Sequence, residues 1–463
     1  MADQKKSAAI EVIRTLRWRG HQAYLVGGCV RDLLLGREPA DYDVATDATP
    51  QQVMSIFPET WAVGAQFGVV LVPVKGPDVS TAAESHAVPQ QVVEVATFRS
   101  DGVYSDGRHP DRVNFSTDPS EDVRRRDFTI NGLLLDYQTL DPELYEVRDF
   151  VGGRADLQAG VIRAIGVAQQ RFTEDKLRML RAVRFAARFN FQIEEATFAA
   201  IRELAREIHA VSRERIRDEL SKMLTEGRAR RAFELLDETG LLAEVLPEIA
   251  AMKGVAQPPQ YHPEGDVWTH TLLMLENLPH SASPASKTLA WGVLLHDVGK
   301  PSTFRVAPDR IRFDGHVEVG VRMAEEICHR LRFSNDDTAQ ISALVANHMR
   351  FADAPKMKAS TLKKFVRLPA FEEHLELHRI DCSSSHGDLR NYEFVKQSIA
   401  EMPAEEIRPR PLLTGDDLIA AGYRPGPRFK EILGLVEDAQ LEGGLENREH
   451  ALEFVARQFS EGK

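Results

Sequence analysis

The chain has 463 residues, of which 43% are hydrophobic, and a formal net charge of −12. No apolar segment approaches the length of a membrane-spanning helix, and the first residues lack the apolar core of a signal peptide, so we expect a cytoplasmic protein with no membrane partner. Cys29, Cys328 and Cys382 are scattered and odd in number, which excludes a disulfide framework or thiolate zinc site and predicts reduced, buried thiols.

The first part of the chain is predicted to be an α+β domain. Apolar residues recur at helical spacing between residues 6 and 17, and strand-like runs follow at 24–26, 69–74 and 92–97. Residues 76–90, rich in Pro, Ser and Ala, are interpreted as a surface insertion without a chemical role.

A glycine turn and a carboxylate pair follow the run at 24–26. Gly27 and Gly28 expose backbone N–H groups and the N-terminus of the next helix, a geometry that holds a polyphosphate. Asp41 and Asp43 would lie on one face of a strand, where a divalent cation between them relieves their repulsion. With Arg31 one helical turn after the glycines, this combination predicts Mg²⁺-dependent nucleotidyl transfer.

Helical patterns dominate beyond about residue 173, and no convincing strand is predicted there. They are interrupted at 254–263 and around 403–411, where Gly and Pro accumulate. The breaks predict four modules: a head at 1–150, a helical neck and body at 151–253, a second helical module at 254–400, and a helical tail at 401–463.

The neck and body carry a local excess of basic residues. Residues 160–231 hold 16 Lys or Arg against 10 Asp or Glu, a local charge of +6 that leaves −18 for the rest of the chain. Such a basic belt fits an RNA backbone bound at one place. Ordinary surface arginines paired with Glu are the alternative interpretation.

Six short motifs follow one another in the first 250 residues. They are Gly27-Gly28-x-x-Arg31-Asp32, Asp41-x-Asp43, the segment 93–99, the segment 125–132, Glu174-Asp175-x-x-Arg178, and Glu214-Arg215. This order resembles the class II tRNA nucleotidyltransferase and poly(A) polymerase family over residues 20–250. The fold that the resemblance implies is α+β, with a polymerase-β-like nucleotidyltransferase head followed by an all-helical neck and body.

The resemblance also implies an activity and a set of site residues. The expected reaction adds CMP, CMP and AMP to the 3′ end of tRNA from CTP and ATP, with release of pyrophosphate. Asp41 and Asp43 would hold Mg²⁺, and Glu94 is the candidate third catalytic carboxylate. The implied nucleotide-binding residues are Gly27, Gly28, Arg31, Arg99, Arg125, Arg126, Asp127, Asn131, Asp175, Arg178 and Arg181.

Base choice is expected to depend on Asp175 and Arg178. Cytosine and adenine each present an amino donor beside a ring acceptor, whereas uracil and guanine present a carbonyl beside an N–H. An Asp acceptor next to an Arg donor would accept the first pair and reject the second, because a wrong base leaves buried polar groups unpaired. Three positions apart, the two side chains are predicted to share a helix face, where an intrahelical salt bridge is the alternative.

Two further segments separate the branches of this family. Residues 63–68 lack the basic pair of bacterial poly(A) polymerases, which favours the CCA-adding branch over a poly(A) polymerase. Residues 100–124 resemble the flexible loop that CCA-adding and A-adding enzymes share, so an A-adding enzyme of a split system stays open. A non-catalytic RNA-binding scaffold is the alternative from a different class, and intact catalytic residues speak against it.

A second set of chemically active residues lies in the helical module. Its members are His270, His296, Asp297, His316, His348 and Asp381. Their order, with adjacent His and Asp after an apolar helix, resembles the HD phosphohydrolase superfamily over residues 258–390 and implies an all-helical HD domain. In that superfamily the first metal would be held by His270, His296, Asp297 and Asp381, and the second by His316 and His348.

We infer the metal of this module from the type of its ligands, and its substrate from the expected activity of the head. Imidazole and carboxylate ligands suit Ni²⁺, Mn²⁺, Co²⁺, Fe²⁺ or Mg²⁺. Lys300 is expected to contact a phosphate. Because the head acts on an RNA 3′ end, we expect a 2′,3′-cyclic phosphate or a 3′-phosphate as substrate; a signalling-nucleotide phosphodiesterase is the alternative. A reading in which the HD domain is the main activity, and a homodimer as the assembly, both stay open.

Overall fold

The computed structural model describes residues 2–62, 67–74, 91–102, 112–137, 144–279 and 285–459. They form two compact units, Met1–Pro247 and Glu248–Lys463. No helix within these ranges is long and apolar enough to cross a membrane. The expected insertion at 76–90, the part of the expected flexible loop at 103–111 and residues 63–66 lie outside the described residues.

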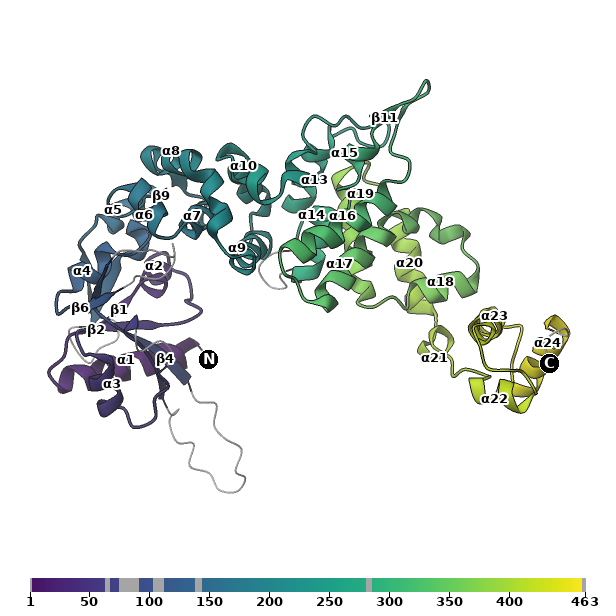
Figure 1. Cartoon of the computed structure of the whole chain (residues 1–463), viewed down its shortest axis with the longest axis horizontal. Helices are drawn as coiled ribbons and strands as arrows, with labels where there is room; N and C mark the ends of the chain where they lie inside the picture. Colours follow the sequence, from purple (N-terminus) through teal and green to yellow (C-terminus); the bar gives the residue numbers. More distant parts are fainter. Residues whose placement is uncertain are drawn as a thin grey trace. The chain divides into compact units, whose positions relative to one another are not determined.

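The first unit is built on a six-stranded mixed sheet with the order β3-β4-β2-β1-β7-β8. Its strands are β1 (Ala23–Val26), β2 (Asp43–Thr46), β3 (Val69–Val74), β4 (Gln91–Thr97), β7 (Leu133–Tyr137) and β8 (Tyr145–Asp149). Only β2 and β4 pair in parallel among these neighbours. Helix α1 (Ala2–Trp18) packs on the sheet beside β1 and β4 (Figure 1). The strands predicted at 24–26, 69–74 and 92–97 are confirmed.

Short helices and a hairpin complete the head. They are α2 (Gly28–Leu34), α3 (Pro50–Ile56), the hairpin of β5 (Arg99–Asp101) and β6 (Val113–Phe115), α4 (Pro119–Arg124), η2 (Thr129–Asn131) and α5 (Gly153–Ala159). Capping side chains fix two of these ends: Thr49 forms a capping box with Gln52 at the start of α3, and Asp118 caps α4.

The rest of the first unit is helical, as predicted, apart from one small element. The helices are α6 (Ala168–Glu174), α7 (Leu177–Phe189), α8 (Glu195–Leu204), η3 (Ala205–Ala210), α9 (Arg213–Thr225), α10 (Ala229–Glu238), α11 (Leu241–Val245) and α12 (Pro247–Ala250), the last crossing into the second unit. In α7 the apolar positions Leu177, Leu180, Val183 and Ala187 are all buried. The parallel pair of β9 (Val161–Ile162) and β10 (Gln192–Ile193) was not predicted, because two-residue strands carry no periodic pattern.

The second unit begins with a helical module. Its elements are α13 (Val267–Glu276), α14 (Lys287–Leu295), α15 (Lys300–Thr303), α16 (His316–Arg330), α17 (Asn335–Asn347), η4 (His348–Lys356), α18 (Ala359–Phe365), α19 (Phe371–Ser384) and α20 (Arg390–Glu401). Helix α14 is the central core element, since Leu289 to Leu295 are all buried. The only strands described here, β11 (Arg305–Val306) and β12 (Ile311–Arg312), form a small hairpin between α15 and α16.

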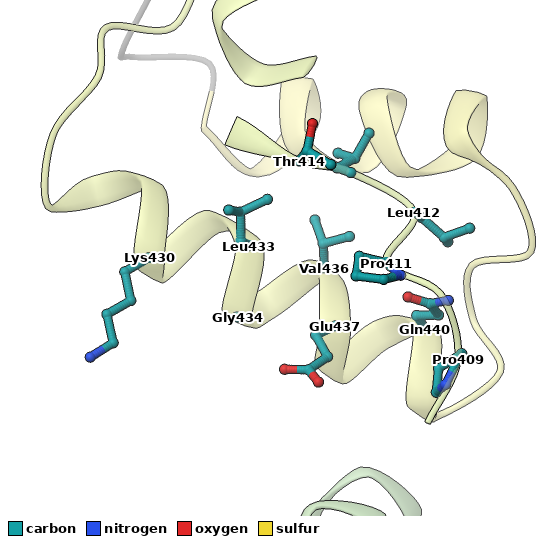
Figure 2. A pocket seen from close by; sticks show the side chains of 11 residues that line it. Pro409, Pro411, Leu412, Thr414, Lys430, Leu433, Gly434, Val436, Glu437 and Gln440 are labelled. Atoms are coloured by element: carbon teal, nitrogen blue, oxygen red, sulfur yellow. The ribbon is translucent and has the colours of Figure 1, made fainter. Parts of the chain in front are cut away.

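The C-terminal segment has its own core and an open groove. Helices α21 (Ala404–Ile407), α22 (Gly415–Ala420), α23 (Arg428–Leu441) and α24 (Arg448–Gln458) follow one another. Leu418, Ile432 and Val455 lie in their shared core. A groove of about 780 Å³ runs between residues 409–414 and α23, with Pro411 beside Val436 (Figure 2). Its apolar lining carries no metal-type cluster of side chains.

Gly299, between α14 and α15, packs too closely on α16 for any side chain. A Cβ atom there would lie 2.1 Å from the His316 carbonyl oxygen and 2.7 Å from the Gly320 nitrogen. We expect Gly299→Ala to lower the free energy of unfolding of the second unit by about 1–3 kcal/mol, the usual cost of overpacking. Differential scanning calorimetry should show the lower melting temperature.

Gly434→Ala is the matched control for this prediction. Gly434 lies within α23, where a Cβ atom would meet nothing within 4 Å. This change should leave the melting temperature unchanged or raise it slightly, because Ala favours a helix over Gly. Equal melting of the two variants would contradict the close contact at Gly299.

Candidate active sites

The turn between β1 and α2 brings backbone and a cation together. Gly27 has φ 79° and ψ −130°, a conformation that favours glycine, and its N–H donates to the Leu133 carbonyl at 3.3 Å. A Cβ atom on Gly27 would lie 3.2 Å from Nη1 of Arg126. The Arg126 guanidinium therefore lies directly beside the glycine turn. Its positive charge is of the sign that binds a phosphate.

The three predicted catalytic carboxylates lie on or beside neighbouring strands. Asp43 opens β2 and is in register with Glu94 on the parallel strand β4. Asp41 precedes β2, its side chain is 80% exposed, and its Oδ1 accepts a hydrogen bond from Lys5 Nζ at 2.9 Å. The expectation that Asp41 and Asp43 share a strand is therefore wrong, because the strand begins only at Asp43.

The surroundings of Asp43 fit a cation. Burial, together with the nearby negative charges of Glu94 and Asp41, raises the pKa of Asp43 to about 6, although Arg126 acts in the opposite direction. Such mutual repulsion between carboxylates is the condition that a divalent ion relieves. Among the described residues, however, these three carboxylates do not converge on one point as a metal group does.

Asp127 is the centre of a hydrogen-bond network between the head and α7. Its Oδ2 accepts from Nε and Nη2 of Arg181 at 2.9 and 2.7 Å, and its Oδ1 accepts from Asn131 Nδ2 at 3.0 Å. Burial alone would raise the pKa of Asp127, but Arg181 and Asn131 outweigh it and lower the pKa to about 2. The carboxylate is thus charged and fully engaged by its neighbours.

The same network holds Arg31. Its Nη1 donates to Asn131 Oδ1 at 2.6 Å, and its Nε donates to Asp32 at 2.8 Å. The guanidinium also lies over the rings of Phe185 and Phe189 in α7, at 5.1 and 4.6 Å from their centroids. Arg31 is buried, so in this arrangement it joins α2 to α7.

Three other predicted arginines are also held by protein groups. Arg125 and Arg126 both pair with the buried carboxylate of Asp122, at 2.5 and 2.9 Å. Arg99 donates to the Phe67 carbonyl. Of these three arginines, Arg126 lies next to the glycine turn, and all three are oriented by acidic or carbonyl partners.

Asp175 and Arg178 do not lie on one helix face, so that expectation is wrong. Asp175 has extended backbone at the junction between α6 and α7, and Arg178 lies in the first turn of α7. Asp175 Oδ2 accepts from Arg215 Nη2 at 2.7 Å, whereas Arg178 Nη1 pairs with Glu174 at 2.6 Å. With separate partners, the two side chains do not form the salt bridge that was the alternative interpretation.

The basic belt at 160–231 is largely neutralised within the fold. Several of its arginines form ion pairs, including Arg184 with buried Glu219 at 2.6 Å and Arg188 with Glu226 at 3.2 Å. Arg206, by contrast, is 92% exposed and lies 3.8 Å from its nearest carboxylate, Glu244. Arginines that are not closely paired with a carboxylate, such as Arg206, are the side chains that could bind the phosphates of an RNA backbone.

The six predicted ligands of the second unit converge. Ligand atoms of His270, His296 and Asp381 lie within 4.8 Å of one another, and so do those of Asp297, His316 and His348. The residues come from five different helices or helix ends, and all but His316 and Asp381 are buried. The six side chains lie together, but the expected grouping is wrong for Asp297, which falls with His316 and His348 rather than with His270, His296 and Asp381.

Hydrogen bonds fix the orientation of each imidazole. Nδ1 of His296, His316 and His348 lies 2.8, 2.9 and 2.7 Å from the carbonyl oxygen three residues earlier. Because a carbonyl only accepts, each Nδ1 carries the proton and each Nε2 offers a lone pair. The Nε2 atoms of these three residues and of His270 are buried without a hydrogen-bond partner, which fits divalent metal ligation.

Asp297 joins the two groups. Its Oδ2 lies 3.1 Å from His296 Nε2, and its Oδ1 lies 3.8 Å from His348 Nε2. Burial would raise the pKa of Asp297, but His296 and Lys300 hold it well below the usual range. Lys300 is bound to Asp297 at 2.6 Å and to Gln257 at 2.7 Å, so one N–H of its ammonium is left for a phosphate.

Three side chains around this centre were not predicted from the sequence. Glu264 accepts from His270 Nδ1 at 2.7 Å and contacts His262 at 2.9 Å, and Gln257 holds Lys300. All three precede α13 in an irregular segment without periodicity. The spacing His262-x-Glu264, six residues before His270, was the signal that could have drawn attention to them.

Three family models match successive parts of the chain. A model of the poly A polymerase head domain matches residues 23–163, a "Probable RNA and SrmB-binding site of polymerase A" matches 190–253, and an HD domain matches 266–380. The CCA-adding enzyme of Lactobacillus johnsonii is 38% identical over 453 residues, covering 97% of each chain. That of Geobacillus stearothermophilus is 42% identical over 242 residues, or 52% of this chain and 55% of the relative.

Solved structures agree on the fold. The Bacillus stearothermophilus CCA-adding enzyme in complex with CTP superposes with a TM-score of 0.71 at 28% identity, covering 98% of each chain. The Thermotoga maritima CCA-adding enzyme complexed with tRNA gives a TM-score of 0.56 at 20% identity, covering 97% of this chain and 94% of that one. The second likeness concerns the fold alone.

Replacing His296 and Asp297 together with Ala should remove divalent metal from the second unit. Each of the two ligand groups loses one member, since His296 belongs to one and Asp297 to the other. The measurement is elemental analysis after loading with Ni²⁺ or Mn²⁺ and removal of free ions. His209→Ala, which removes a surface histidine paired with Glu244, is the control and should retain the metal. Wild-type protein that retains no metal in this unit would make the histidines structural.

Proposed function

This chain belongs to the family of CCA-adding enzymes, and we propose that it adds CMP, CMP and AMP in turn to the 3′ end of tRNA, using CTP and ATP and releasing pyrophosphate. It is a nucleotidyltransferase with a poly A polymerase head domain. The observation that carries the proposal is the Asp127 network, which joins the glycine turn to the neck helix that carries Arg178 and Arg181. If the phosphates of a nucleotide bind at the glycine turn, its base would extend to the neck.

The head residues have separate roles in this proposal. Gly28, at the N-terminus of α2, would present its backbone N–H to the triphosphate, and Arg126 beside the turn would supply positive charge. Gly27 shapes the turn but cannot offer its N–H as expected, because that group donates to the Leu133 carbonyl. Asp43 and Asp41 would hold Mg²⁺, with Glu94 as the neighbouring carboxylate. When bound, the ion would acidify the attacking 3′-hydroxyl and neutralise the leaving pyrophosphate. Lys5, paired with Asp41, would have to release it for both carboxylates to bind the same ion.

Base selection is proposed to rest on Asp175 and Arg178. Asp175 would accept the amino proton of cytosine or adenine, and Arg178 would donate to the adjacent ring nitrogen. Arg215 holds the Asp175 carboxylate at 2.7 Å from α9, and Glu174 holds the Arg178 guanidinium at 2.6 Å. These partners fix the acceptor and the donor before a nucleotide binds, which lowers the ordering cost of recognition.

We also propose that the second unit is a metal-dependent phosphohydrolase acting on 2′,3′-cyclic phosphates or 3′-phosphates. The support is the set of four buried Nε2 lone pairs without hydrogen-bond partners and the bridging position of Asp297. Ni²⁺, Mn²⁺, Co²⁺, Fe²⁺ or Mg²⁺ suits this ligand set and, when bound, would supply a hydroxide near neutral pH. Lys300 would orient Asp297 and offer its remaining N–H to the phosphate. Hydrolysis of a 3′-phosphate, or opening of a 2′,3′-cyclic phosphate at its P–O3′ bond to leave a 2′-phosphate, would expose the 3′-hydroxyl that the head extends.

Changing Asp41 and Asp43 to Ala should abolish nucleotide addition and spare phosphohydrolysis, because the two ligand sets lie in separate compact units. The His296 and Asp297 double variant should show the reciprocal pattern. Extension of tRNA lacking its 3′ end with CTP, ATP or both measures the first activity, and hydrolysis of a 2′,3′-cyclic nucleotide measures the second. Extension by the Asp41 and Asp43 variant would refute the assignment of these carboxylates to the catalytic site of the head. ATP-only extension from a CC end, without CTP addition, would identify an A-adding enzyme.

Asp175→Ala should reduce discrimination against UTP and GTP by about 1–3 kcal/mol for each lost pairing, the cost of an unsatisfied buried polar group. Arg178→Ala should reduce incorporation of both correct nucleotides, since both lose the same donor. The readout is the kcat/KM ratio for each of the four triphosphates on tRNA lacking its 3′ end.

Arg215→Ala tests the support of Asp175 and should relax base choice in the same direction. Arg217→Ala, on the same helix and paired with Asp218, is the matched control and should keep the wild-type preference. If the three test variants, Asp175→Ala, Arg178→Ala and Arg215→Ala, lose rate but keep the preference for C and A, the base is selected elsewhere.

A further inference from the structure

The metal-type histidines of the second unit are not held alike. His296, His316 and His348 each direct Nδ1 to a backbone carbonyl. His270 instead directs Nδ1 to the carboxylate of Glu264, at 2.7 Å. Glu264 thus supports one histidine of the centre with a full negative charge, whereas a neutral dipole supports the other three.

The chain before α13 fixes Glu264 in place. Asp266 caps α13 by accepting from Thr269 N at 2.8 Å, and its other oxygen accepts from Gly254 N at 2.6 Å. The Val267 N–H donates to the Val255 carbonyl at 3.0 Å, and Gly265 adopts φ 133°. These contacts close the segment 254–266 into a loop that directs the Glu264 side chain inward, where it is 7% exposed.

His262 completes the arrangement from the outer side. Its Nδ1 lies 2.9 Å from the same Oε1 of Glu264 that accepts from His270, and its ring is 4.9 Å from the His270 ring. Oε1 therefore has two imidazole neighbours, while Oε2 is buried without a hydrogen-bond partner. One carboxylate oxygen is shared by an inner and an outer histidine.

We propose that Glu264 is a positioning residue for the metal bound by His270, His296 and Asp381, with His262 orienting its carboxylate. By accepting from Nδ1, Glu264 keeps the proton there and leaves the Nε2 lone pair, 3.2 Å from Asp381 Oδ1, to the metal. A charged acceptor strengthens this hydrogen bond and makes the imidazole a better electron donor. The inference rests on the proposed metal centre and assigns Glu264 to the His270 half of it.

Metal titration of the full chain tests this assignment. In Glu264→Gln the amide oxygen still accepts a hydrogen bond but the charge is lost, and in Glu264→Ala both are lost. Affinity for Ni²⁺ at one of the two sites should fall about 10-fold to 100-fold, the usual effect of removing such a partner, and the other site should be unchanged. Glu244→Gln makes the same change at a surface Glu–His pair of 2.9 Å and should bind Ni²⁺ as the wild type does.

A second measurement needs no metal. In the metal-free protein, proton NMR should show a strongly downfield His270 Nδ1–H signal, because its acceptor is a carboxylate; the signal should shift in Glu264→Gln and disappear in Glu264→Ala. If Glu264→Ala fails to fold, the isosteric Gln variant decides both measurements. Wild-type Ni²⁺ affinity at both sites of the Gln variant, or an unshifted signal, would overturn the role of Glu264. A wild-type second unit that binds no metal would instead refute the metal centre itself.

Discussion

The geometry of the first unit depends on one buried charge, the carboxylate of Asp127. Arg181 from α7 and Asn131 from η2 bind it, and Asn131 in turn holds Arg31 of α2. Breaking such a network by removing one partner leaves an uncompensated buried charge, which typically costs about 3–5 kcal/mol. Helix α2, η2 and the neck helix α7 are therefore held in one arrangement by a few charge-assisted hydrogen bonds, and the low pKa of Asp127, about 2, keeps these bonds intact at physiological pH.

The two candidate sites differ in whether their polar side chains already have hydrogen-bond partners within the protein. In the head, Arg31, Arg125 and Arg126 are already paired with carboxylates, so a triphosphate would enter a site whose cations are oriented beforehand. In the second unit the Nε2 atoms of four histidines are buried without hydrogen-bond partners. Buried polar atoms usually have partners, so their convergence marks a place for a ligand that the protein itself does not supply. The cations of the first site are thus oriented by the protein's own charges, whereas the second site has the donor atoms that a metal ion would require.

Periodicity and spacing predicted much of this from the sequence. The strands at 24–26, 69–74 and 92–97 and the buried face of α7 follow from alternating and helical apolar patterns. The six metal-type side chains could be named in order, because each lies on or beside an apolar helix whose burial brings it inward. Where a pattern was extended across a boundary, it failed: Asp41 lies before its strand and Asp175 before its helix, because an element's end depends on hydrogen bonds that spacing does not record.

The reactive groups can be identified from the order of residues: a glycine turn, an Asp-x-Asp pair, an Asp and an Arg at the neck, and an ordered set of histidines and aspartates. How each of these groups is held depends on contacts that form when the chain folds. Lys5 reaches Asp41 across 36 residues, Arg215 reaches Asp175 across 40, and Glu264 meets His270 from an irregular loop. Such partners are brought together by chain folding over long separations, and they follow no local period. The reactive side chains can therefore be identified from the sequence. The fold sets their charge and orientation and determines which of their atoms remain available to a ligand.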